Sequence, residues 1–149
     1  LELEGMPKSE SQSRARDLIE LVGLTGFESW LPRDLSGGMA QRVAIARSLV
    51  HQPDILLLDE PFGALDAITR DRMGAELLRI WHSYKKTVLM VTHSIQEAVY
   101  LADRVLVLSP RPGRLRMDLE IDFPRPRQDS VRYTPEFGDI ARQLKDAIG

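Results

Sequence analysis

Two adjacent carboxylates, Asp59 and Glu60, follow the unbroken apolar run at residues 55–58. Such a run is typical of a strand buried on both faces of a parallel sheet, and these sheets bind ligands beyond the carboxyl ends of their strands. One carboxylate there could hold Mg²⁺, usually through water, while its neighbour orients or deprotonates an attacking water in phosphoryl transfer. The alternative is that the two acids end a strand in an ordinary loop.

His93 follows a second strand-like segment, residues 87–92. If the two strands are near neighbours in a parallel sheet, His93 emerges at the same sheet edge as the acidic pair, where its imidazole could reach a terminal phosphate. A histidine in this position could equally be a surface residue at the start of a helix. The functional interpretation of His93 therefore depends on how the strands pair.

Ser36, Gly37 and Gly38 open a segment with helical spacing. Serine is a favourable N-cap, glycine allows a ligand to approach the backbone closely, and the start of a helix offers free N–H groups at its positive end. This combination suits an anion such as a phosphate, although a plain capped helix is the alternative. No glycine in the chain is followed by lysine, so these 149 residues contain no P-loop of the form Gly-x-x-x-x-Gly-Lys-Ser/Thr.

The elements that must position these residues alternate between two hydrophobic periods. Apolar residues at helical spacing predict helices over residues 8–24, 37–51, 67–81, 94–102 and 135–148. Apolar runs predict strands over residues 55–58, 87–92 and 104–108, and a turn at residues 110–113 predicts a hairpin with a strand at 114–121. Strands that alternate with helices predict a parallel α/β sheet with right-handed crossovers.

Composition excludes several other classes of protein. The 20 basic and 22 acidic residues give a net charge of −2, which disfavours a nucleic-acid partner recruited by bulk positive charge. The absence of cysteine excludes disulfides, thiolate metal sites and a cysteine nucleophile. The apolar runs are too short to cross a bilayer, so any membrane contact is expected through a protein partner. The Pro/Arg-rich stretch 123–127 is predicted to be a linker, with the arginines of the tail in solvent.

Four linked motifs carry a family resemblance. Residues 35–42 (LSGGMAQR), 55–61 (ILLLDEP), 64–66 (ALD) and His93 resemble, in order and spacing, the nucleotide-binding subunit of an ABC transporter. The resemblance implies an α/β fold, a partial P-loop NTPase (RecA-type) parallel sheet with part of the ABC helical subdomain. It implies the following roles: the signature motif for Ser36, Gly37, Gly38, Met39 and Gln41, the Walker B aspartate for Asp59, the catalytic glutamate for Glu60, the D-loop for Asp66 and the switch histidine for His93.

The same resemblance implies ligands and partners. ATP and Mg²⁺ would be bound as two subunits close head to tail, with the signature helix of one completing the ATP site on the P-loop of the other. Transmembrane permease subunits, and indirectly a periplasmic or extracellular solute-binding protein, would be the further partners, with no nucleic acid. The subunit would lie peripherally on the cytoplasmic face of the membrane. Residues 61–66 and 108–114 resemble importer ATPases of the nitrate, sulfonate and taurine group.

The chain departs from the family pattern in two ways. Met39 stands where the commonest signature has glutamine, and the Walker A loop and Q-loop, which in the family precede the signature motif, do not occur in these 149 residues. We therefore expect the C-terminal half or more of such a subunit, inactive as an ATPase by itself. Residues 1–52 would belong to the helical subdomain, 53–122 to the α/β core and 123–149 to a tail with a helix. With other strands of the fold outside the chain, uncovered apolar surface and self-association are expected.

Two other functions fit parts of the pattern. A regulatory or interaction module could keep the signature motif without holding ATP, with Asp59 and Glu60 as relics. A DNA-repair or chromosome-maintenance ATPase carries similar motifs but precedes its signature with a long coiled coil. Residues 1–24 show no sustained heptads and the net charge is slightly negative, so this second alternative is disfavoured.

Overall fold

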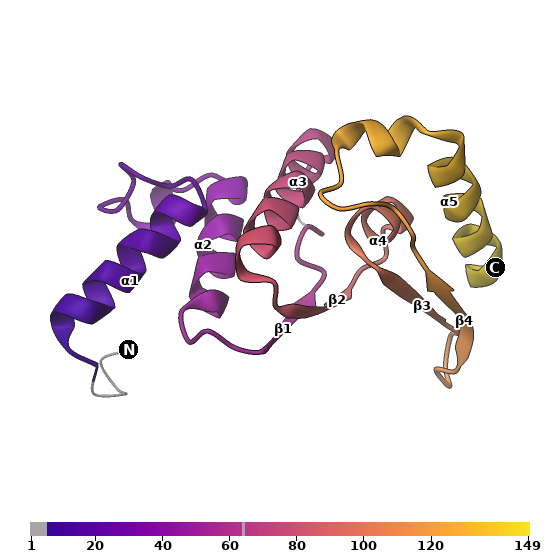
Figure 1. Cartoon of the computed structure of the whole chain (residues 1–149), viewed down its shortest axis with the longest axis horizontal. Coiled ribbons are helices and arrows are strands. Elements are labelled where there is room, and N and C mark those ends of the chain that lie inside the picture. Colours follow the sequence, from indigo (N-terminus) through magenta and orange to yellow (C-terminus); the bar gives the residue numbers. More distant parts are fainter. Residues whose placement is uncertain (1–5, 64) are drawn as a thin grey trace. The chain divides into compact units, whose positions relative to one another are not determined.

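The structure, a computed structural model, describes residues 6–63 and 65–149 (Figure 1). Its contacts group the chain into two compact units, Leu1–Val91 and Thr92–Gly149. Among the described residues, no helix is both long enough and apolar enough to pass through a bilayer.

In its described residues, the first unit combines three α-helices with two strands. In order, it contains α1 (Lys8–Leu21), the 3₁₀ helix η2 (Pro32–Asp34), α2 (Gly37–Leu49), β1 (Ile55–Asp59), α3 (Ala67–Tyr84) and β2 (Thr87–Val91). Helix α1 packs against α2, and the Arg14 guanidinium donates to the Val50 carbonyl at 3.1 Å. The core consists of buried apolar side chains from these elements, chiefly Leu18, Val22, Ile45, Leu49, Leu56, Phe62, Met73, Leu77 and Ile80.

Strands β1 and β2 form a parallel pair in register, with Ile55 opposite Thr87 and Asp59 opposite Val91. The predicted parallel pairing is thereby confirmed. The prediction that these strands are buried on both faces is wrong for the described residues. Leu56 is buried, whereas Leu57 and Leu89 are 69% and 59% exposed. A sheet face is buried only where a second layer packs on it, and in the described part of the first unit only the Leu56 face is covered.

This exposed face gives a prediction for the 149-residue chain in solution. Replacing Leu57 and Leu89 together by lysine is expected to reduce self-association, because contiguous apolar surface drives chains together and charge opposes it. Light scattering across a concentration series measures the effect. Gln12→Lys with Gln143→Lys adds the same two charges elsewhere and should leave association unchanged. A wild-type chain that stays monomeric at every concentration would contradict the prediction.

The second unit is built on a hairpin and two α-helices. It contains α4 (Ile95–Leu101), β3 (Arg104–Leu108), β4 (Leu115–Glu120), the 3₁₀ helix η3 (Asp129–Tyr133) and α5 (Pro135–Ile148). The strands β3 and β4 are antiparallel, with Arg104 opposite Glu120 and a register shift between Val107 and Leu108. Helix α5 contacts α4 and both strands, and its N-cap Thr134 accepts from the Phe137 N–H at 3.2 Å. The predicted hairpin is confirmed.

One topological prediction needs correction. Residues 104–108 were expected to extend the parallel sheet, but β3 pairs with β4 in a sheet separate from that of β1 and β2. Within the described residues, β3 has a hydrogen-bonded strand on one edge only, the antiparallel β4, which is reached through a short turn. The α/β class and the parallel β1–β2 pair agree with a partial P-loop NTPase fold.

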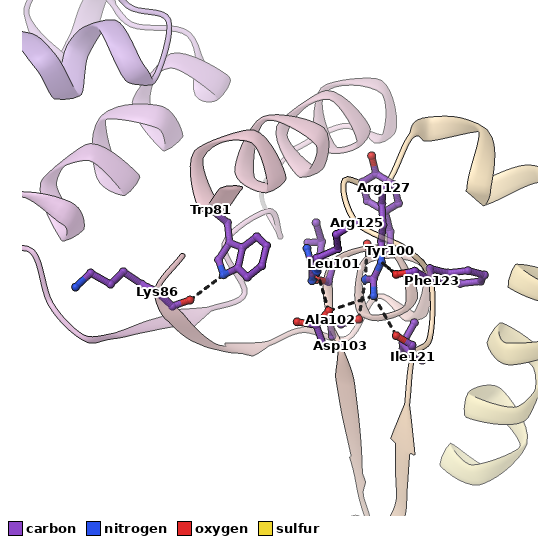
Figure 2. A network of polar contacts seen from close by, with 10 residues as sticks. All are labelled: Trp81, Lys86, Tyr100, Leu101, Ala102, Asp103, Ile121, Phe123, Arg125 and Arg127. Atoms are coloured by element: carbon purple, nitrogen blue, oxygen red, sulfur yellow. Dashed lines mark hydrogen bonds and ion pairs between the residues drawn. The ribbon is translucent and has the colours of Figure 1, made fainter. Parts of the chain in front are cut away.

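The Pro/Arg-rich stretch is packed, contrary to the predicted linker (Figure 2). The Arg127 side chain is fully buried and donates to the carbonyl oxygens of Tyr100 at 3.0 Å, Ala102 at 2.7 Å and Ile121 at 3.2 Å. Arg125 donates to the Leu101 carbonyl at 2.8 Å. The carbonyls of Tyr100, Leu101 and Ala102 are the last of α4 and its C-cap, which have no partner within the helix. Burial, aided by the positive charge of Arg125, lowers the pKa of Arg127.

Residues of the tail also contact Tyr100 of α4. Its hydroxyl donates to the Asp129 carboxylate at 2.8 Å, and the Arg132 guanidinium lies 3.6 Å from the centre of its ring. Burial, together with the bond to Asp129, raises the pKa of Tyr100 to about 12. Phe123 stacks on Phe137 with ring centres 6.1 Å apart. The tail is therefore an integral part of the second unit.

Candidate functional site

The first candidate site is the start of α2. Ser36 is extended and its Oγ accepts a hydrogen bond from the Met39 N–H at 3.3 Å, so it is the N-cap that the sequence predicts. Gly37 and Gly38 are the first two residues of the helix. Their amides belong to the group of N–H donors that an α-helix leaves without internal partners. The local chain thus has the form of an anion-binding helix start.

The two glycines differ in the space around them. A Cβ atom on Gly38 would lie 3.3 Å from Cγ2 of Thr69, which is tighter than an ordinary contact. A Cβ atom on Gly37 would lie 3.5 Å from Cδ2 of Leu65, which is an ordinary contact distance. Gly38 therefore allows close packing against α3, while Gly37 has room for a methyl group.

A pocket of about 360 Å³ lies between the starts of α2 and α3. It brings together most of the residues expected to form a signature motif and the aspartate expected in a D-loop. It is lined by Ser36, Gly37, Gly38, Met39, Arg42, Leu65, Asp66, Thr69, Arg72 and Met73. Gln41 lies on α2 and is not part of this lining, and Ala64 lies outside the described residues. The presence of Arg42 and Arg72 in this lining was not predicted from the sequence, because no local pattern links residues so far apart along the chain.

Asp66 is the N-cap of α3. Its Oδ1 accepts from the Thr69 N–H at 3.0 Å, and hydrogen bonds from the Thr69 side chain and backbone lower the pKa of Asp66. The carboxylate therefore stays ionised and stabilises the helix start through both the hydrogen bond and the helix dipole. Its position in the pocket lining places a negative charge close to the start of α2.

The acidic pair lies at the carboxyl end of β1. Asp59 is the last residue of the strand and lies opposite Val91, whose carbonyl accepts from the Glu60 N–H at 2.8 Å. Both acidic residues are exposed. Glu60 has a φ of +43°, in the left-handed region that residues other than glycine seldom adopt. The Gly63 N–H donates to the Glu60 carbonyl at 3.1 Å and closes the turn that holds this conformation.

His93 belongs to the second unit, in the bend between β2 and α4. It follows Val91, the partner of Asp59 in the strand register, by two positions and its side chain is exposed. Its two neighbours are hydrogen-bonded: the Ser94 N–H donates to Thr92 Oγ1 at 3.0 Å, and the Thr92 hydroxyl donates to Glu97 at 2.6 Å. Sequence reasoning missed Thr92 and Glu97, although Ser94-x-x-Glu97 is a capping-box pattern that could have indicated them.

The residues at the strand end suit magnesium in their donor chemistry. Mg²⁺ is usually held by one or two carboxylates together with waters and substrate phosphates, not by a cage of protein ligands. The exposed carboxylate of Asp59 meets that requirement, and within the described residues no group of three or more ionisable ligands forms a cage. The donor chemistry of Asp59 is therefore compatible with a divalent cation.

Known proteins resemble this chain in both sequence and structure. Residues 2–63 match the family described as ABC transporter. An uncharacterized ABC transporter ATP-binding protein of Methanocaldococcus jannaschii is 53% identical over 99% of this chain. The aliphatic sulfonates import ATP-binding protein SsuB 2 of Nocardia farcinica is 52% identical over 97% of the chain, and the taurine import ATP-binding protein TauB of Rhizobium johnstonii is 45% identical over 97%.

The solved structures that resemble this chain are also ABC transporter cassettes. The dimeric structure of a bacterial ABC transporter cassette matches 80% of this chain with a TM-score of 0.63 and 34% identity. A dimeric cassette in a post-hydrolysis state, bound to ADP and phosphate, matches with the same score and 33% identity. The chain spans 56% to 58% of the length of the three relatives named above and 50% of each cassette. This chain belongs to the ABC transporter ATP-binding family.

Proposed function

We propose that the protein carrying this chain is an ATP-binding and hydrolysing subunit of an ABC importer, which couples ATP hydrolysis to solute uptake. The observation that carries the proposal is the glycine-rich, serine-capped start of α2, which shares a pocket with Asp66. The names of the relatives support it, since they include importers of taurine and of aliphatic sulfonates. Small organic sulfonates are therefore the first solutes to test.

The proposed roles follow from residue chemistry. Gly37 and Gly38 present helix-terminal amides to the γ-phosphate of ATP held by a second subunit, with Ser36 and Met39 beside them and Gln41 one turn further along α2. Asp59 holds Mg²⁺, which neutralises phosphate charge during phosphoryl transfer. Glu60 aligns and deprotonates the attacking water, and His93 contacts the terminal phosphate from the switch position.

The proposed partners are a second ATP-binding subunit, transmembrane permease subunits and, through them, an extracytoplasmic solute-binding protein. The proposed location is the cytoplasmic face of the membrane, where the subunit is peripheral. The division into a helical part (1–52), a core part (53–122) and a tail (123–149) stays a prediction.

Reconstitution tests the function directly. The protein carrying this chain is purified with its permease subunits, placed in proteoliposomes and assayed for ATP hydrolysis and for uptake of labelled taurine. ATP-dependent uptake is expected. Stable assembly with the permease but no ATP turnover under any condition would instead support the non-catalytic interaction module.

A separate prediction concerns Gly37. Gly37→Asp is expected to lower ATP hydrolysis about 10²-fold, because it adds a negative charge where backbone amides would meet phosphate. The fold should be preserved or slightly stabilised, since an acidic residue in the first turn of a helix is favourable. Steady-state ATPase assays and unfolding midpoints measure the two effects.

Gly37→Ala is the matched control for this experiment. It adds a Cβ at an ordinary contact distance from Leu65 and no charge, so most of the activity should remain. Full activity in Gly37→Asp would reject the phosphate role. Equal losses in the two variants would show that the cause is bulk and not charge.

A further inference from the structure

Three polar side chains form a closed set of hydrogen bonds around His93. The Thr92 hydroxyl donates to Oε2 of Glu97 at 2.6 Å and accepts from the Ser94 N–H at 3.0 Å. The Ser94 Oγ in turn accepts from the Glu97 N–H at 3.3 Å. Glu97 is only 6% exposed. The residues before and after His93 are thus both linked to Glu97, Thr92 to its buried carboxylate and Ser94 to its backbone N–H.

The set is a modified capping box. In the usual box, the acidic side chain three residues into the helix accepts directly from the N–H of the N-cap serine or threonine. Here the Thr92 hydroxyl stands between them, accepting from the Ser94 N–H and donating to the Glu97 carboxylate. The helix cap therefore extends back across position 93 and includes the residue on its other side.

Breaking this set removes hydrogen bonds from polar groups that are largely shielded from water. A buried carboxylate that loses a hydrogen bond keeps its desolvation cost, so the native arrangement is favoured over alternative loop conformations. At the other end of α4, Arg125 and Arg127 hold the carbonyls of Leu101, Tyr100 and Ala102. Val99 and Tyr100 are themselves buried. The helix from which Glu97 projects is therefore fixed at both ends.

We infer that Thr92 and Glu97 are positioning residues, which hold the backbone of His93 in one conformation so that its imidazole is presented from a rigid base. Thr92 supplies the hydroxyl that joins the two sides of the histidine, and Glu97 supplies the buried acceptor. The structural part of the inference involves only residues of the second unit. Its consequence for ATP hydrolysis rests on the proposed function.

The structural part is tested by nuclear magnetic resonance on the 149-residue chain. Thr92→Val keeps the shape of the side chain but removes the hydroxyl, and it should lower the order parameter of the His93 amide from about 0.85 to about 0.6. Thr92→Ser keeps the hydroxyl and should leave the order parameter as in the wild type. An unchanged His93 amide in Thr92→Val would overturn the inference. Equal loosening in both variants would also overturn it, since Thr92→Ser keeps the hydroxyl and its loss could not then be the cause.

The catalytic part is tested in the reconstituted importer. Thr92→Val should lower kcat about 10-fold with the KM for ATP unchanged, and Thr92→Ser should restore kcat. In a His93→Ala background, Thr92→Val should cause no further loss, because a residue that acts through His93 has nothing left to position. A wild-type kcat in Thr92→Val, or additive losses with His93→Ala, would overturn the catalytic part.

The two possible failures are distinguishable. If the wild-type protein shows no ATP turnover that depends on Glu60, the proposed function is wrong, while the resonance experiment still decides whether Thr92 holds His93. If the wild type hydrolyses ATP and the order parameter does not respond to Thr92→Val, the inference is wrong and the proposed function stands.

Discussion

Replacing Glu60 by glutamine, in an ATPase-active protein that carries this chain, is expected to lower kcat for ATP hydrolysis by about 10²-fold to 10⁴-fold. Binding of ATP should be retained. The reason is chemical, since the amide occupies the same space as the carboxylate but cannot accept a proton from the attacking water. An interaction that acts only in the transition state lowers kcat without weakening the ground-state complex.

The geometry of the strand end makes this substitution interpretable. The Glu60 side chain is exposed, while its backbone is fixed by the bond to the Val91 carbonyl and by the turn that Gly63 closes. Glutamine should therefore leave the fold unchanged, and a loss of activity can be assigned to the lost carboxylate. Single-turnover assays and equilibrium binding of a fluorescent ATP analogue separate hydrolysis from binding.

The control is Glu20→Gln, which makes the same chemical change at an exposed position on α1. It should leave both hydrolysis and binding as in the wild type. Turnover within about twofold of wild type in Glu60→Gln would reject the catalytic role and leave Glu60 as a residue of the turn. A parallel loss of ATP binding would instead place Glu60 in nucleotide binding.

The second large effect is expected on stability. Arg127→Ala should lower the unfolding free energy of the second unit by about 3–5 kcal/mol, the usual cost of removing one partner from a buried charged network. The change leaves the carbonyls of Tyr100, Ala102 and Ile121 without this donor, in a buried to half-buried region. It also opens a cavity beside Phe123, whose ring lies 5.9 Å from the guanidinium.

Urea unfolding followed through amide resonances of α4 and β3 measures this loss. Arg142→Ala is the control, because the Arg142 side chain is 70% exposed and its ion pair with Asp139 is of the surface type that contributes little. The unfolding free energy of Arg127→Lys should lie between those of the wild type and Arg127→Ala. One ammonium group cannot donate to all the carbonyls that the planar guanidinium binds. An unchanged midpoint in Arg127→Ala would show that the network adds no stability.

Much of the fold could be predicted from periodicity and local residue types. The runs at 87–92 and 104–108 became strands within a residue of their expected ends, and the helix over residues 135–148 matches α5. These segments are governed by interactions between near neighbours in the sequence. The pairing of β3 with β4 was predictable from the turn at residues 110–113, whereas periodicity alone identifies a strand without naming its partner.

Arg127 shows a different limit of sequence reasoning. Arginine in a proline-rich stretch is usually solvated, and nothing in the residues around position 127 indicates that the carbonyls at the end of α4 need a donor. That need arises only once the tail has folded back to that helix. Burial of a charged side chain is decided by tertiary partners, so it lies beyond a one-dimensional pattern.

The candidate site was partly predictable for the same reasons. Ser36 was identified as an N-cap from its residue type and the glycines that follow, and the structure shows that hydrogen bond. Arg42 and Arg72 reach the same pocket from two different helices, so their meeting depends on how α2 and α3 pack. The roles assigned to Asp59, Glu60 and His93 remain proposals, because they depend on a bound nucleotide.

The left-handed backbone of Glu60 implies a conflict between stability and activity at this position. A residue with a side chain adopts a φ of +43° at a cost of about 1–2 kcal/mol relative to glycine. Selection for thermal stability alone would therefore favour glycine at position 60 and remove the carboxylate with it. A stabilising screen applied to this protein should recover Glu60→Gly among its gains, and the same variant should be among those that have lost ATP turnover.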